Sequence, residues 1–189
     1  MSQSISIAAA DTMATYIEAK DRIDLKLLGR AFVEGDCEIE YSDKTQLVSL
    51  PNSSRGLQQI IQFMASFGDQ CENIRTFLLS RPNSDYLAHF RCDFLVGMNA
   101  RQDGTVRVGY GRYNWHFANN GRLKKLGIVL EVMCVPPAEQ SKLILPLLSA
   151  LPYPWCSYHQ ARESIPSIDA LRPIAHFLKR TEENKPAKV

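Results

Sequence analysis

The spacing of hydrophobic positions changes several times along the chain. Between residues 11 and 32 apolar side chains recur every three to four positions, which predicts two helices, the second capped by Asp24. Apolar and polar positions alternate between residues 37 and 42, as in a half-buried strand. The helical spacing returns at Ser53 or Ser54 and predicts a helix that covers an apolar surface. The two clearest helical stripes are Met13, Tyr16, Ile17 and Lys20 on the first helix and Leu57, Ile60, Ile61, Met64 and Phe67 on this one.

Residues 74–135 predict a sheet of long strands. Turn sequences such as Asn119-Asn120-Gly121 separate four segments in which apolar and polar positions alternate. In the second segment one face is apolar and the other carries His89, Arg91 and Asp93, which is typical of an antiparallel sheet with one buried face. The four segments are 74–80, 86–97, 106–118 and 122–135.

The pattern changes again at Pro136, where the predicted sheet ends. Residues 143–151 predict a helix bent at Pro146, and the aromatic segment 151–158 is too apolar for a solvated linker. A short helix near 174–179 precedes a charged end. We therefore predict a folded domain at 1–136, a helical and aromatic extension at 137–180 that packs on it, and a disordered tail at 181–189.

Composition indicates a chain that can build a core but carries no strong field. Of its 189 residues, 45% are hydrophobic and 22% are charged, and the formal net charge is +2. So small a charge does not supply the positive field that binding to nucleic-acid phosphates requires. No run reaches the roughly 18 apolar residues of a membrane span, and the start lacks the basic residues of a secretory signal. We expect a cytoplasmic protein with no nucleic-acid or membrane partner.

The cysteines argue against disulfides and metal. There are five, widely spaced, with neither a C-x-x-C pair nor a Cys/His ligand spacing. They are typical of small apolar residues in a reducing compartment. The histidines and carboxylates likewise share no face at the spacing of metal ligands. We therefore expect no metal and no other cofactor.

Four segments, in this order along the chain, resemble the NTF2-like superfamily, and within it the SnoaL-like group: the entry helices, the acidic strand 34–41, the helix start 55–60, and the hairpin from 108–113 to 120–124. Relatives of this group are scytalone dehydratase, ketosteroid isomerase and the small subunits of aromatic-ring dioxygenases. The resemblance covers about residues 11–136. It implies an α+β fold in which a curved antiparallel sheet wraps around the N-terminal helices as a cone with an apolar cavity, here followed by the helical extension.

The resemblance also implies candidate catalytic residues. Tyr16 matches the first-helix tyrosine that hydrogen-bonds the substrate oxygen in the isomerases. The two catalytic aspartates of the isomerases fall near Tyr41 and at Tyr113, and the essential histidine of the dehydratases falls at Thr76 or Phe77. Neither mechanism transfers directly, because the expected carboxylates and histidine are replaced. We expect the three tyrosines to converge on the cavity as hydrogen-bond donors.

A general base is harder to assign. Asp43 at the mouth of the cone, or Glu40 beside it, could act as a base next to these phenols, although each also fits an ordinary surface carboxylate. His89 and His116 fall on the outer face of the sheet. His159 could reach the cavity only if the C-terminal extension caps it. Asp43 therefore joins the three tyrosines as a catalytic candidate.

The strand period predicts which side chains would line the cavity. If Tyr113 faces inward, so do alternate positions of its strand, and on the following strand Leu130 and Val132 should face inward as well. Such a lining suits a flat or polycyclic apolar ligand, but the same stripe also fits a plain core, and the sequence leaves both open. The candidate substrate-binding residues are Met64, Phe67, Phe90, Phe94, Trp115, Phe117, Leu126 and Ile128.

Two classes of function follow from the sequence. The first is a protein that binds a small apolar compound, phenolic, polyketide-like or steroid-like, with or without metal-independent dehydratase or isomerase activity. The second is a non-catalytic assembly subunit resembling the small dioxygenase subunits. In either case we expect a homodimer formed through the outer sheet face, whose polar residues are His89, Arg91, Asp93, Arg112 and His116.

Overall fold

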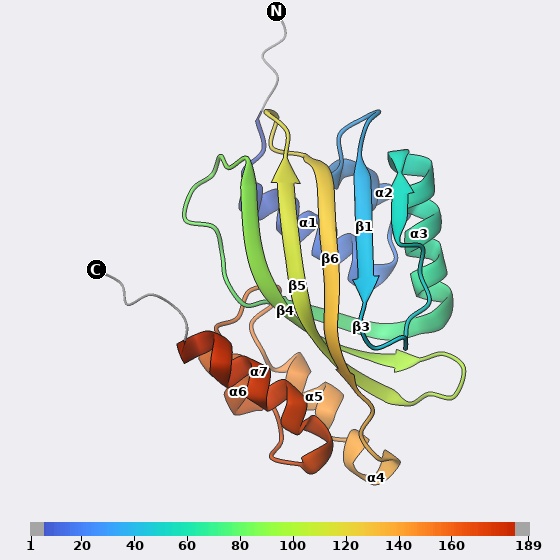
Figure 1. Ribbon diagram of the computed structural model, residues 1–189, viewed down its shortest axis with the longest axis vertical. Coiled ribbons are helices and arrows are strands. Elements are labelled where there is room, and N and C mark those ends of the chain that lie inside the picture. The colour runs from blue at the N-terminus through green and yellow to red at the C-terminus, as the bar shows by residue number, and fades with distance from the viewer. Residues whose placement is uncertain (1–5, 184–189) are drawn as a thin grey trace, which may run out of the picture.

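The structure is a computed structural model that describes residues 6–183. Its centre is a curved six-stranded sheet in the order β2-β1-β6-β5-β4-β3 (Figure 1). Neighbouring strands are antiparallel except β1 and β6, which pair in parallel, so the sheet is mixed and not purely antiparallel as predicted. The strands are β1 (Glu38–Asp43), β2 (Ser53–Arg55), β3 (Cys71–Leu78), β4 (His89–Ala100), β5 (Val106–Phe117) and β6 (Leu123–Cys134).

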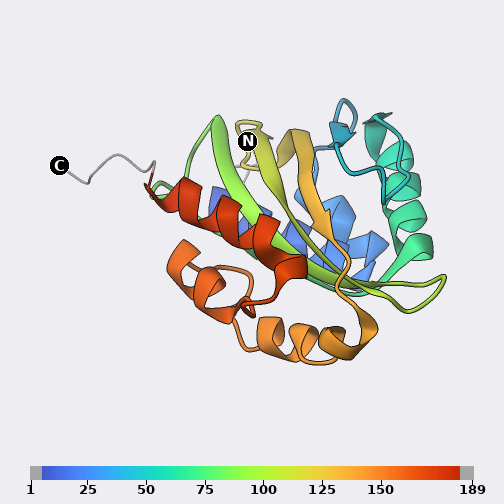
Figure 2. The same cartoon turned by 60° about the horizontal axis from the view of Figure 1, so that its bottom comes forward.

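Helices cover both faces of this sheet (Figures 1 and 2). The N-terminal helices and α3 cover the inner face, and the C-terminal helices cover part of the outer face. The predicted α+β arrangement, with N-terminal helices, a curved sheet and a helical C-terminal extension, is confirmed. The helices are α1 (Ala9–Arg22), α2 (Leu25–Ala31), α3 (Gly56–Gln70), α4 (Ala138–Ser141), α5 (Ile144–Ser149), α6 (Tyr158–Ser164) and α7 (Arg172–Glu183).

Local signals explain several element boundaries. Asp24 caps α2 as predicted, because its carboxylate accepts hydrogen bonds from the N–H groups of Lys26 and Leu27. The helix start expected at Ser53 or Ser54 is wrong, because those residues pair with β1 as the short strand β2.

Two C-terminal elements differ from the expectation. Helix α6 was not predicted, although Ser157 and Gln160 form a capping box at its start. Helix α7 continues to Glu183, into the segment expected to be disordered, and residues 184–189 lie outside the described residues.

The sheet has two apolar faces, not one. On the outer face Leu95, Val108 and Tyr110 pack against residues of the extension such as Leu148 and Ile174. The sequence predicted a polar outer face. It did not show that these apolar side chains are buried, because the helices that cover them lie about forty or more residues further along the chain. The part of the outer face that carries Asp93 is therefore covered by the chain's own extension.

Asp93 is the polar centre of this outer contact. It is 5% exposed. Its carboxylate accepts hydrogen bonds from the hydroxyls of Tyr110 (2.7 Å) and Tyr158 (2.8 Å) and from Nε of Arg112 (3.1 Å). A buried carboxylate requires such donors, and here they come from β5 and α6. Asp93 thus joins the extension to the sheet.

The thiols of the chain are part of its packed interior. All five cysteines are buried, and none of them is in a disulfide. None of the helices within residues 6–183 is long and apolar enough to cross a membrane.

We predict that Asp93→Ala lowers the free energy of unfolding by about 3 kcal/mol, because it removes an acceptor that two buried phenols and the Arg112 guanidinium share. Urea unfolding followed by circular dichroism measures the change. Asp36→Ala, at an exposed carboxylate, is the matched control and should change stability by less than about 0.5 kcal/mol. Equal small effects of the two substitutions would show that Asp93 does not hold the extension.

Candidate functional site

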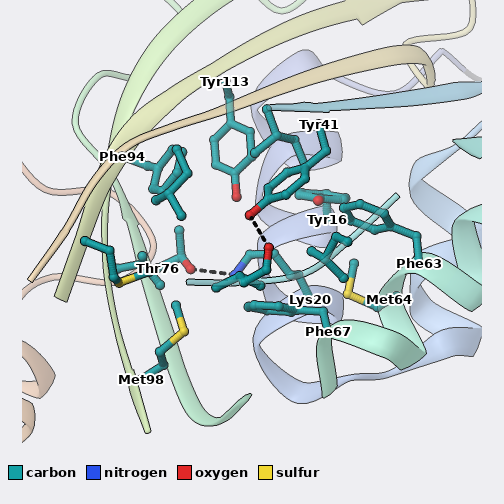
Figure 3. A pocket seen from close by; sticks show the side chains of 16 residues that line it. Tyr16, Lys20, Tyr41, Phe63, Met64, Phe67, Thr76, Phe94, Met98 and Tyr113 are labelled. Carbon is teal, nitrogen blue, oxygen red and sulfur yellow. Dashed lines mark hydrogen bonds between the residues drawn. The ribbon is translucent and has the colours of Figure 1, made fainter. Parts of the chain in front are cut away.

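A small cavity lies between the inner face of the sheet and helices α1 and α3 (Figure 3). Its volume is about 50 Å³, which admits a few water molecules but is less than the roughly 150 Å³ that holds benzene. A polycyclic ligand, as the sequence suggested, does not fit this volume. Most of the wall is apolar and includes Met64, Phe67, Phe94, Met98, Ile128 and Met133.

Tyr16, Tyr41 and Tyr113 bring their hydroxyls into this cavity from α1, β1 and β5 (Figure 3). The rings of Tyr16 and Tyr113 meet edge to face at 6.0 Å, and the Tyr113 ring lies 4.5 Å from that of Phe94. The Phe94 ring packs closely against Gly111, since a Cβ at position 111 would lie 2.7 Å from the ring. The structure therefore brings together the three tyrosines named from the sequence.

These hydroxyls have few partners within the protein. Among residues 6–183, Tyr16 Oη is buried without a hydrogen-bond partner, and no hydrogen bond of Tyr113 Oη is found. Tyr41 Oη donates a long hydrogen bond, 3.5 Å, to the carbonyl of Val48. A buried phenol without a partner costs about 1–3 kcal/mol. The hydroxyls of Tyr16 and Tyr113 are therefore available to a ligand or to water, and that of Tyr41 is only weakly held.

The environment keeps all three phenols protonated. Burial raises the pKa of Tyr16 well above its usual value, and the charge of Asp21 adds to the effect. Burial raises the pKa of Tyr113 in the same way, and that of Tyr41 is raised by burial and then by Asp43. The phenols can therefore donate hydrogen bonds at any physiological pH.

Lys20 is a charged residue of the site that was not among the predicted site residues. It lies one turn after Tyr16 on α1, is 6% exposed, and lines the cavity. Its ammonium donates to Asp21 Oδ1 (2.6 Å) and to Thr76 Oγ1 (2.6 Å), and it lies 5.4 Å from the centre of the Phe67 ring. Because an ammonium has three N–H groups, one remains for the cavity. A lysine on the apolar stripe of the first helix was the signal that could have identified it.

The other candidate substrate-binding residues divide into two groups. Met64, Phe67, Phe94 and Ile128 line the cavity. The rest lie outside the cavity wall: Trp115 packs edge to face on Tyr16 at 5.5 Å, and Phe117 lines a separate hollow with Ala9 and Leu87. The aromatic stripe is thus plain core at one end of the sheet and cavity wall at the other. The residues outside the cavity wall are Phe90, Trp115, Phe117 and Leu126.

A bulge in β6 changes which side chains reach the cavity. Tyr110 pairs with Val132 and Gly111 with Leu130, so Glu131 is an extra residue between them. The alternation is therefore reversed beyond this point. Val132 lies on the outer face, contrary to the prediction, and Met133 lines the cavity instead.

Asp43 does not line the cavity, which corrects its selection as a base at the site. Its carboxylate accepts hydrogen bonds from the N–H and hydroxyl of Thr45 (both 2.6 Å) and from the N–H of Val48 (3.1 Å), and so fixes the turn after β1. Glu40 is exposed and pairs with Lys125 at 2.6 Å. No carboxylate or histidine is among the described residues that line the cavity.

The histidines lie elsewhere. His89 and His116 face each other on the outer side of β4 and β5, with their Nδ1 atoms 2.7 Å apart. His159 is exposed in the extension and does not line the cavity. Within residues 6–183, no three His, Cys, Asp or Glu side chains are grouped as metal ligands.

Comparison with solved structures identifies the fold. The chain is similar to an NTF2-like protein of unknown function from Burkholderia pseudomallei K96243, with a TM-score of 0.55 and 18% identity over 65% of this chain and 90% of that chain. A hexachlorocyclohexane dehydrochlorinase (LinA) Type2 matches with a TM-score of 0.54 and 10% identity over 69% and 88% of the two chains. TerC, co-crystallised with polyporic acid, matches with a TM-score of 0.53 and 13% identity over 65% and 91%.

These similarities confirm the NTF2-like fold that the sequence implied. At such low identities they show the fold alone. No protein-family model matches the sequence, and no curated protein matches it either.

We predict that Tyr16→Phe leaves the free energy of unfolding unchanged or raises it by up to about 1 kcal/mol, because it removes a buried hydroxyl that has no partner among the described residues. Tyr110→Phe, which removes a hydroxyl bonded to Asp93, should lower stability by about 1.5–3 kcal/mol. Urea unfolding of both variants makes the comparison. A loss of more than about 1 kcal/mol in Tyr16→Phe would mean that its hydroxyl is satisfied in the folded protein.

The raised phenol pKa values predict a loss of stability in alkali. Because the folded-state pKa values of Tyr16, Tyr41 and Tyr113 lie above the ordinary value of 10.0, their contribution is complete below pH 10.0 and is lost as the pH rises above it. The urea midpoint should therefore fall between about pH 9 and pH 11, and fall less steeply in Tyr16→Phe. Equal slopes in the two proteins would contradict the buried position of this phenol.

Proposed function

We propose that the chain is a SnoaL-like protein that binds a small apolar compound with an acceptor oxygen, carbonyl or phenolic, in the inner cavity. One observation carries the proposal: three phenols and the Lys20 ammonium converge in an apolar space, and the hydroxyls of Tyr16 and Tyr113 have no partner among the described residues. Unpaired donors in an apolar cavity are best satisfied by an acceptor on a ligand.

The wall chemistry supports an aromatic or flat ligand of about one ring. Phe67 and Phe94 offer ring faces, and the phenols and the ammonium offer donors. Met64, Met98 and Met133 supply flexible thioether side chains that can move to admit a ring larger than the present volume. TerC, which has this fold, was co-crystallised with polyporic acid, in keeping with an oxygenated ligand.

The same wall favours binding over a dehydratase or isomerase reaction. Proton abstraction requires a base, and the described lining contains neither a carboxylate nor a histidine. The donors could stabilise a developing oxyanion, but they do not remove a proton. The assembly-subunit alternative is weakened in turn, since the extension covers the Asp93 part of the outer face. A homodimer remains a prediction for the uncovered part around His89 and His116.

We predict that wild type binds acetophenone and para-cresol, and that Tyr113→Phe weakens this binding by about tenfold while stability changes by at most about 1 kcal/mol. Titration calorimetry and thermal melts measure the two effects. Tyr86→Phe, at a tyrosine that is 67% exposed, is the control and should bind as wild type does. Binding of neither compound by wild type would refute the ligand-binding proposal and favour the assembly subunit.

A further inference from the structure

The C-terminal extension reaches the inner site through one tyrosine. The hydroxyl of Tyr153 donates to Asp21 Oδ2 at 3.1 Å, although the two residues are 132 positions apart. Asp21 Oδ1 accepts from the Lys20 ammonium at 2.6 Å. A continuous set of hydrogen bonds therefore runs from the extension to the cation at the cavity wall.

We infer that Tyr153 and Asp21 are positioning residues that hold the Lys20 ammonium toward the acceptor oxygen of the ligand, so that the extension forms part of the binding site. The inference rests on the proposed function. Neither residue lines the cavity, so both act through Lys20.

The donors around Asp21 explain how it can hold the ammonium in place. Oδ1 accepts from Lys20 and from the Thr76 hydroxyl (2.8 Å), and Oδ2 accepts from the Thr76 N–H (2.7 Å) and from Tyr153. Asp21 lies in the last turn of α1, where the helix dipole disfavours a negative charge. The carboxylate therefore depends on these donors, and loss of the Tyr153 hydroxyl leaves Oδ2 with one of its two.

Tyr153 is itself fixed on the strand that carries Thr76. The guanidinium of Arg75 lies 4.5 Å from the centre of its ring, and the ring of Phe77 meets it edge to face at 6.1 Å. Beside it, the N–H of Leu78 donates to the Pro154 carbonyl at 2.7 Å, and the N–H of Cys156 donates to Leu78 at 3.1 Å. Because β3 is an edge strand, the extension passes around that edge and reaches the inner face.

A matched control separates positioning from simple anchoring of the extension. Tyr158→Phe removes a second phenol–carboxylate hydrogen bond of the extension, which goes to Asp93 on the outer face at 2.8 Å. Tyr153→Phe removes the one that goes to Asp21. If both hydroxyls only anchor the extension, the two variants should affect the cavity alike.

The first measurement compares acetophenone with ethylbenzene, which lacks the carbonyl oxygen. Tyr153→Phe should weaken acetophenone binding by about three- to tenfold and leave ethylbenzene within about twofold, whereas Tyr158→Phe should not change the ratio of the two affinities. In a Lys20→Met background, Tyr153→Phe should cause no further loss, since its effect passes through the ammonium. Equal weakening of both compounds, or the same loss without Lys20, would overturn the inference.

The second measurement needs no ligand. Trace acetylation followed by peptide mass spectrometry gives the reactivity of the Lys20 amine relative to exposed Lys26. Tyr153→Phe should raise it by about threefold or more, and Tyr158→Phe should leave it unchanged. If wild type binds neither compound but this difference appears, the proposed function is wrong and the positioning stands. If acetophenone binds but reactivity and affinity ratio match wild type in Tyr153→Phe, the positioning is wrong and the proposed function stands.

Discussion

The inner face and part of the outer face of one curved sheet are buried, and this constraint governs the polar chemistry of the molecule. Helices α1 and α3 cover the inner face and the C-terminal helices cover part of the outer face. Any polar side chain on a covered strand position must then find a partner inside the protein, since water is excluded. The two faces meet this requirement differently. This difference distinguishes the Asp93 contact on the outer face from the candidate site on the inner face.

On the outer face the requirement is met by the protein itself. The phenols of Tyr110 and Tyr158 share the carboxylate of Asp93 and so become part of the packing of the extension. On the inner face the phenols of Tyr16 and Tyr113 converge without an acceptor among the described residues. The same side-chain chemistry therefore stabilises the fold on one face and leaves binding capacity on the other.

The extension connects these two faces. It packs on the outer face, closes the edge of β3 with backbone hydrogen bonds at Leu78, and places Tyr153 beside Asp21. A segment that covers an exposed strand edge also prevents pairing with other chains. Packing of the C-terminal helices and the position of Lys20 are thus linked through one strand.

The sequence by itself determined what depends on local spacing: helix α3 and the alternation of side chains along β4 and β5. These follow from backbone periods that each segment carries alone. The tyrosines at positions 16, 41 and 113 came instead from the resemblance to the NTF2-like superfamily. Only the tertiary structure decided what depends on distant partners. Lys20 meets Thr76 from a strand 56 positions away, and Asp93 is buried by a helix 65 positions away. Burial and hydrogen-bond satisfaction are properties of the packed chain. The alternation along a strand separates its two faces, but it does not show which of them a distant element covers.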